Sequence, residues 1–140
     1  MVTVLYAGLI YSGIIFAFGT MLGVVRTLLL VPLLGPVAAV ALEVPVMLVL
    51  SWLVCGVVLR RLAVPARVPV RLVMGTTALA FLWVSEALLA MALGAGAASF
   101  FAAFATPAGA LGAVAQIAFA AFPLLRHRTG VAARDDQRLH

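Results

Sequence analysis

The sequence is poor in charged and reactive residues. Only 9% of its 140 residues are charged, against about 25% in soluble proteins. Lysine and asparagine are absent, and Cys55 is the only cysteine. The low charge excludes an ordinary soluble domain and a disordered chain, and a single cysteine excludes an internal disulfide. Because 66% of the residues are hydrophobic, the remaining class is an integral membrane protein.

Patterns that carry catalysis or metal binding are also missing. His127 and His140 stand alone near the C-terminus, so no group of His, Cys and carboxylate residues has the spacing of metal ligands. No histidine follows Cys55 at helical spacing, and no glycine-rich phosphate loop follows a strand. We therefore predict that the protein is not an enzyme, has no catalytic or metal-binding residues and takes no cofactor.

Four apolar segments are long enough to cross a membrane as helices, which takes about 20 residues each. They cover residues 2–30, 36–59, 72–93 and 107–125. They form one membrane domain over residues 1–125, followed by a polar tail over residues 126–140. The sequence therefore predicts an all-α integral membrane four-helix bundle made of two helical hairpins.

All nine basic residues are arginines, and eight of them follow or flank the apolar segments. Four lie in and beside the connection between the second and third segments, namely Arg60, Arg61, Arg67 and Arg71. Arginines gather on the cytoplasmic side of membrane proteins, so both termini are predicted to be cytoplasmic. This rule explains the basic charge without nucleic acid, and we expect these four arginines to contact lipid headgroups.

Each apolar segment also carries one strongly polar residue, at a similar depth below the outer turns. These residues are Arg26, Glu43, Glu86 and Gln116. An ionised side chain in the membrane costs about 2.5 to 3.5 kcal/mol on insertion scales, so such residues face the bundle interior. Arg26 and Glu43 are expected to pair across the first hairpin. Glu86 is expected to be protonated or to share the arginine.

Small residues recur at helical spacing beside these polar positions, which is typical of closely packed membrane helices. The predicted packing residues are Gly8, Ser12, Gly19, Gly23, Gly109 and Gly112. Trp83, Met47 and Ser51 share helical faces with the two glutamates and are candidates for lining a pocket.

The sequence does not decide between two roles for the polar cluster. It is either a functional site or a structural clamp that fixes helix register. Our leading hypothesis is a non-enzymatic accessory or assembly subunit that packs in a larger membrane complex, with lipid and other membrane subunits as partners. The first alternative is a small oligomeric transporter or channel that uses Arg26, Glu43 and Glu86. The second is a binder of a pigment, quinone or lipid.

Several short stretches carry a resemblance to a known group of proteins. These stretches are GVVRTLLLVPLLG at 23–35, LEVPVM at 42–47, MG at 74–75, SE at 85–86 and TPAG at 106–109. Together they resemble a group of four-helix proteins of proteobacterial inner membranes that has no assigned activity. The resemblance implies a multi-pass protein of the bacterial inner membrane and implies no activity.

Overall fold

The computed structural model describes the backbone of residues 1–138 and the side chains of residues 1–126. The histidines and arginines that follow Arg126 in the predicted tail therefore lie outside the described side chains. The described chain is helical and contains no strand. Its elements are α1 (Val2–Val25), η1 (Arg26–Leu30), α2 (Val31–Leu34), α3 (Pro36–Arg61), α4 (Val68–Ala92), α5 (Ala97–Ala103) and α6 (Pro107–Arg138).

Four of these helical stretches are long and apolar enough to cross a membrane. They cover Val2–Leu34, Pro36–Arg61, Val68–Ala92 and Pro107–Arg126. A span of 20 residues is about 30 Å long, which matches the hydrocarbon thickness of a bilayer. The prediction of an all-α protein with four helices long and apolar enough to span a membrane is confirmed. The cytoplasmic location of both termini stays a prediction.

Glycine and proline residues set the ends of these helices. Gly35 has a φ of 81°, which a residue with a side chain rarely adopts, and Pro36 then starts α3. Gly94, with a φ of 91°, follows the end of α4 in the same way. The chain therefore reverses direction within a single residue between α2 and α3.

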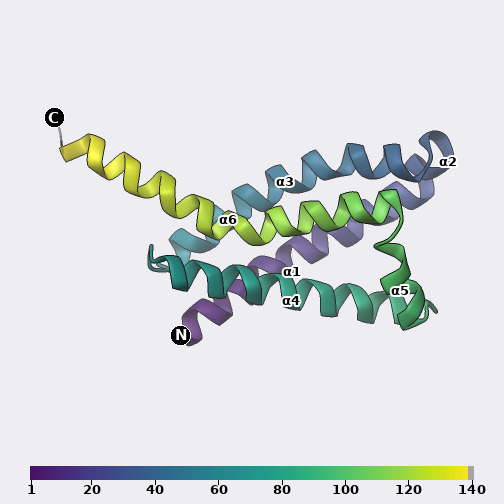
Figure 1. Cartoon of the computed structure of the whole chain (residues 1–140), viewed down its shortest axis with the longest axis horizontal. Coiled ribbons are helices and arrows are strands. Elements are labelled where there is room, and N and C mark those ends of the chain that lie inside the picture. Colours follow the sequence, from purple (N-terminus) through teal and green to yellow (C-terminus); the bar gives the residue numbers. More distant parts are fainter. Residues whose placement is uncertain (139–140) are drawn as a thin grey trace.

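The four long helices form a closed bundle in which each packs against two others. The extensive contacts join α1 with α4, α4 with α6, α6 with α3, and α3 with α1. The start of α1 and the connection from α3 to α4 lie at one end of the bundle, and α2 and α5 lie at the other (Figure 1). Packing is as extensive between the two predicted hairpins as within them, so neither hairpin is a separate unit.

The tightly packed core occupies the part of the bundle nearer the α3–α4 connection. Tyr11 of α1 is completely buried and stacks on Phe119 of α6, with ring centroids 4.4 Å apart. Its hydroxyl donates a hydrogen bond to the main-chain oxygen of Phe119 at 3.1 Å. Met74 and Cys55 are buried around this pair. The hydrogen bond satisfies the polar end of a tyrosine that has no access to water.

Apolar side chains cover the outside of the bundle as well as its core. Val49 is 60% exposed, Val84 57% and Val114 64%, and each lies in a different long helix. An exposed apolar surface on every helix is unfavourable in water but matches a hydrocarbon environment. This surface supports the assignment of a multi-pass membrane protein.

Two local features differ from the sequence prediction. The connection between the predicted spans 72–93 and 107–125 contains the short helix α5, which the sequence analysis did not predict. Residues Arg26–Leu30 form a π-helical turn, in which the N–H of Val31 donates to the main-chain oxygen of Arg26. Pro32 follows at once and has no N–H to donate, so the ordinary helical pattern is interrupted here.

The structure predicts that Gly75 is needed for the contact between α4 and α6. Gly75→Ala is expected to lower the free energy of unfolding by about 1 to 3 kcal/mol, because the added methyl group would collide with the main-chain oxygen of Ala120. Gly13→Ala is the matched control, since nothing lies within 4 Å of a Cβ added there. Unfolding by SDS in mixed micelles measures both variants, and equal stabilities would contradict this close approach.

Candidate functional site

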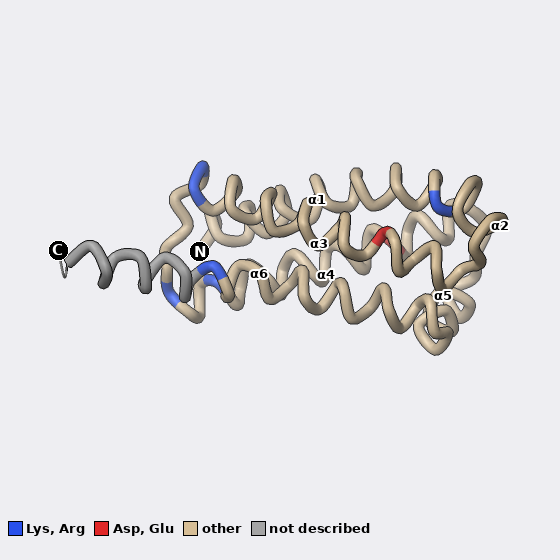
Figure 2. Tube along the Cα trace, turned by 90° about the horizontal axis from the view of Figure 1, so that it is seen from above, with Lys and Arg blue, Asp and Glu red and all other residues tan. Residues whose placement is uncertain are grey.

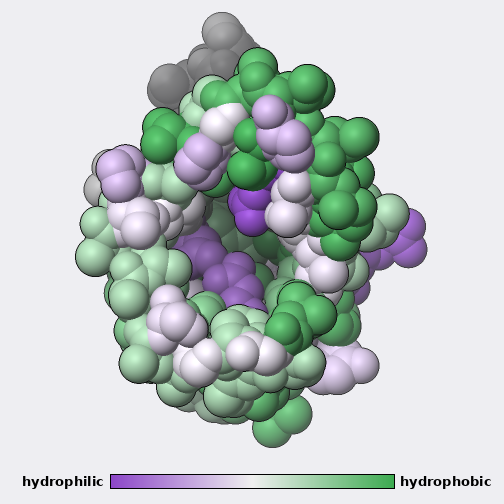
Figure 3. All heavy atoms as spheres, turned by 90° about the vertical axis from the view of Figure 1, so that its right-hand side faces the viewer, coloured by the Kyte–Doolittle hydropathy of each residue, from purple (hydrophilic) through white to green (hydrophobic). Residues whose placement is uncertain are grey.

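A large cavity lies between the helices in the half of the bundle that carries α2 and α5. Its volume is about 970 Å³, and residues of all the long helices and of α5 line it. Viewed from that end, the molecule is hollowed, and the most hydrophilic side chains lie inside a rim of apolar and weakly polar ones (Figure 3). Phe119, which stacks on Tyr11, is part of the lining, so the packed core closes the cavity at its inner end.

Arg26 and Glu43 form an ion pair on the cavity wall. The Arg26 Nη1 donates to Oε2 of Glu43 at 2.7 Å, which is a short charge-assisted hydrogen bond. The Arg26 side chain is 33% exposed and that of Glu43 is 11% exposed. The turn at Gly35 places η1 beside the start of α3, so the two residues meet at one depth. This is the contact expected across the first hairpin.

Glu86 is held by a neutral partner rather than by the arginine. The side-chain amide of Gln116 donates from Nε2 to both carboxylate oxygens of Glu86, each at 2.8 Å. The Oε1 of the same amide accepts a hydrogen bond from Nε1 of Trp83 at 2.7 Å. Trp83 thereby fixes which way the Gln116 amide points, and Gln116 fixes the carboxylate.

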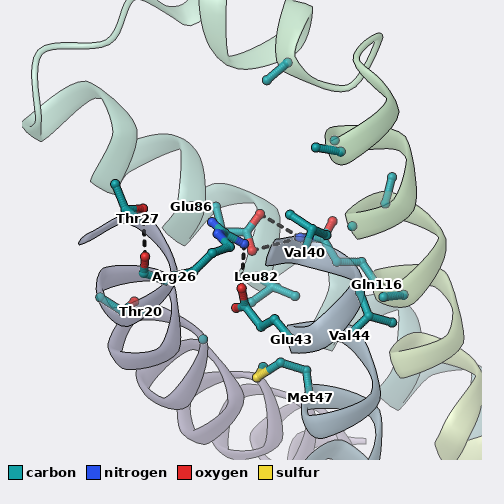
Figure 4. Close-up of a pocket in the computed structure, with 18 of the residues that line it drawn as sticks. Thr20, Arg26, Thr27, Val40, Glu43, Val44, Met47, Leu82, Glu86 and Gln116 are labelled. Carbon is teal, nitrogen blue, oxygen red and sulfur yellow. Dashed lines mark hydrogen bonds and ion pairs between the residues drawn. The ribbon is translucent and has the colours of Figure 1, made fainter. Parts of the chain in front are cut away.

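The ion pair and the Glu86–Gln116 pair lie together on the cavity wall. In the close-up, Arg26, Glu43, Glu86 and Gln116 point toward one another from different helices (Figure 4). Arg26 attracts the negative charge of Glu86, whereas Glu43 repels it. The four predicted polar residues are therefore one cluster, and all four line the cavity.

The predicted packing residues divide into two groups. Gly8 and Ser12 lie in the packed half: a Cβ on Gly8 would lie 2.9 Å from the main-chain oxygen of Met74, and Ser12 is fully buried. Gly109 lies against the main-chain oxygen of Ala103 at the start of α6.

Gly19, Gly23 and Gly112 line the cavity, as does Gly109. Nothing lies within 4 Å of a Cβ added to Gly112, and a Cβ on Gly19 would meet only Met47, at 3.5 Å. Gly19 thus contacts α3 through Met47, whereas Gly112 faces open space. The absence of a side chain at Gly112 leaves open space on the cavity wall.

The candidates for pocket lining also divide. Met47 and Ser51 line the cavity. Trp83 does not belong to the lining, and it reaches the site only through Gln116. Its ring lies 6.0 Å from that of Phe104, which does line the cavity.

Among the four arginines near the α3–α4 connection, Arg71 differs from the expectation. Arg60, Arg61 and Arg67 are exposed at the end of the bundle that carries most of the described basic residues (Figure 2). Arg71 is only 6% exposed. Its Nη2 and Nε donate to the main-chain oxygens of Val64 and Pro65, both at 3.1 Å. Arg71 therefore holds the connection in place and does not project toward lipid headgroups.

A contact between an arginine and an aromatic ring, which the sequence analysis did not predict, lies at the end of the bundle opposite the cavity mouth. The Arg126 guanidinium lies 4.3 Å from the ring centroid of Trp52, which is a cation–π geometry. Gly56 provides the space, since a Cβ there would collide with that guanidinium. Nothing in the sequence indicates that a glycine in α3 and an arginine at the end of the fourth span lie in contact.

Comparisons with known proteins assign the chain to no family. No protein-family model, curated protein or solved structure matches the chain. The resemblance to four-helix proteobacterial membrane proteins therefore stays a prediction. Within the described residues, no group of three His, Cys, Asp or Glu residues could hold a metal ion. The site is therefore a cavity whose wall carries hydrogen-bonding and charged groups in fixed positions.

The ion pair predicts a difference between single and double variants. Arg26→Gln is expected to lower the free energy of unfolding by about 1 to 3 kcal/mol, because Glu43 would then face only another carboxylate; the partial exposure of Arg26 reduces the effect. Combining Arg26→Gln with Glu43→Gln removes both charges and is expected to restore much of this loss. Unfolding by SDS at neutral pH measures the free energy of unfolding of both variants. A double variant less stable than Arg26→Gln alone would contradict the pairing.

The open mouth predicts that the cavity is reached by water from one side of the membrane. In a Cys55→Ala background, Gly112→Cys is expected to react with a membrane-impermeant methanethiosulfonate from the side that carries α2 and α5. Gly13→Cys, outside the cavity lining, is the matched control and is expected to stay unmodified. Equal labelling of the two positions in spheroplasts would contradict an aqueous cavity, and labelling of Gly112→Cys only from the cytoplasmic side would overturn the predicted orientation.

Proposed function

We propose that the protein binds a small organic molecule inside its membrane-spanning bundle. The observation that carries this proposal is the cavity of about 970 Å³ with Arg26, Glu43, Glu86 and Gln116 on its wall. Binding sites in proteins are concave, mostly apolar, and contain a few polar groups that orient the ligand. Charged residues inside a membrane protein are costly, and they commonly mark a ligand or ion pathway.

The glycines favour this function over that of an accessory subunit. The subunit hypothesis rests on rows of small residues that could receive helices of a partner. Gly19, Gly23 and Gly112 instead leave space inside the chain's own bundle. The same residues that argued for a partner therefore support an internal ligand, and residues of all four long helices of one chain line the cavity.

The packed end of the cavity favours binding over conduction. Tyr11 and Phe119 stack between the cavity and the opposite end of the bundle, and Met74 and Cys55 are buried around them. A channel would require a continuous path through this core. The geometry supports entry and exit through the mouth between α2 and α5, and a transporter would have to open the core in a second conformation.

For the location, we propose the inner membrane of a bacterium, with the cavity mouth on the outer side. The support is the arginine distribution: Arg60, Arg61 and Arg67 are exposed at the end opposite the mouth. Basic residues of this kind remain on the cytoplasmic side. A ligand would then arrive from outside the cell or from the outer leaflet.

Filling the cavity tests the proposed function. Gly112→Leu adds a bulky apolar side chain to the lining at a position with free space around it, so the fold is expected to tolerate it. We expect an organic molecule to co-purify with the wild-type protein from native membranes in mild detergent and to be depleted at least about tenfold with Gly112→Leu. Native mass spectrometry and mass spectrometry of an organic extract measure both.

Gly13→Leu is the control for this experiment. It makes the same change in another long helix, also where nothing lies within 4 Å of the added Cβ, but outside the cavity lining. It is expected to retain the co-purifying molecule. An identical set of bound molecules in both variants, or none with the wild-type protein, would count against an internal binding site.

A further inference from the structure

The charges on the cavity wall do not cancel. The charged residues of the lining are Arg26, Glu43 and Glu86. Arg26 donates to Glu43 at 2.7 Å, whereas Glu86 receives its hydrogen bonds from the neutral amide of Gln116. When all three are ionised, the wall carries one surplus negative charge, and it lies on Glu86.

Glu86 keeps room for another hydrogen-bond donor. A carboxylate has about four acceptor positions on its two oxygens. Gln116 supplies one amide nitrogen, shared between the two oxygens. Because Trp83 holds the other end of that amide, the carboxylate is oriented before any ligand arrives. The remaining acceptor positions are available to a donor in the cavity.

The rest of the lining is apolar and aromatic. Phe100 and Phe104 of the mouth region and Phe119 of the inner end all line the cavity. Such a wall fits an organic body, and the faces of aromatic rings also attract cations. A metal ion such as calcium takes about six to eight oxygen ligands. This cluster has two carboxylates, one of which is already paired with Arg26, so it does not supply that many.

We propose that the cavity binds an organic ammonium ion whose N–H groups donate to the Glu86 carboxylate and whose apolar body lies among the phenylalanines. This inference rests on the proposed function, since it names the chemical class of the molecule that the cavity takes. An anion is disfavoured because the cation on the wall, Arg26, is already held by Glu43. A charge-assisted hydrogen bond between an ammonium ion and a carboxylate is stronger than one between neutral groups.

Three probes with matched apolar bodies test the ligand class. They are 4-phenylbutylammonium, the neutral 4-phenylbutanol and the anionic 5-phenylpentanoate. Binding to the full chain in lipid nanodiscs is measured by calorimetry against protein-free nanodiscs at neutral pH, where an alkylamine is protonated. We expect the ammonium ion to bind about tenfold or more tightly than the alcohol, because a hydrogen bond to a charged group is the stronger one, and the carboxylate probe to bind least.

Two variants assign the preference to Glu86. Glu86→Gln keeps the size of the side chain and can still accept from Gln116, so it is expected to fold and to bind the ammonium and the alcohol within about twofold of each other. Gly13→Leu lies outside the cavity lining, at a position with nothing within 4 Å of the added Cβ. It is the control and is expected to retain the preference for the ammonium ion.

The outcomes separate this inference from the proposed function. Equal binding of the ammonium ion and the alcohol, with both blocked by Gly112→Leu, would overturn the ammonium assignment and leave the binding cavity supported. A preference that persists in Glu86→Gln, tightest binding of 5-phenylpentanoate, or no binding of any probe would also overturn the assignment. The molecule that co-purifies with the wild-type protein tests the cavity itself, independently of these probes.

Discussion

The structure depends on the cost of placing ionised side chains within a hydrocarbon layer. Arg26, Glu43 and Glu86 lie in helices that are otherwise apolar enough to span a membrane. Each charge would oppose insertion if it faced lipid. The bundle turns all three inward, pairs two of them at 2.7 Å and holds the third with a glutamine. The relative rotation of the four long helices follows from this requirement.

The chain divides its interior between a packed half and a hollow half. In the packed half, Gly8 and Gly75 let backbones approach until a single methyl group would collide with a main-chain oxygen. In the hollow half, Gly112 has free space beside it, and the polar cluster lies on the wall. Glycine thus allows close helix packing at one end of the bundle and leaves part of the cavity free at the other. Such a division supports a protein that holds a ligand in one half and keeps its shape with the other.

The spans and the depth of the polar residues could be predicted from the sequence because both follow from counting along single helices. The Arg26–Glu43 contact followed from one tight turn. The Glu86–Gln116 contact could not be predicted, because it depends on how two helices rotate about their axes. The role of Gly112 could not be read either, since a missing side chain does not reveal what it faces. Arg71 was misassigned because counting arginines ignores the loop carbonyl groups that need donors.

The central claim is that Glu86 is held by Gln116 and not by Arg26. The chain has only two glutamates, so 13C labels on glutamate carboxyl carbons give two signals in solid-state NMR of the protein in bilayers, and Glu86→Gln identifies one of them. With 15N in glutamine side chains, the account predicts strong dipolar dephasing of the Glu86 carbon alone. With 15N in arginine side chains, it predicts that the Glu43 carbon dephases more strongly. The reverse pattern, with Glu86 close to arginine and neither glutamate close to glutamine, would contradict it.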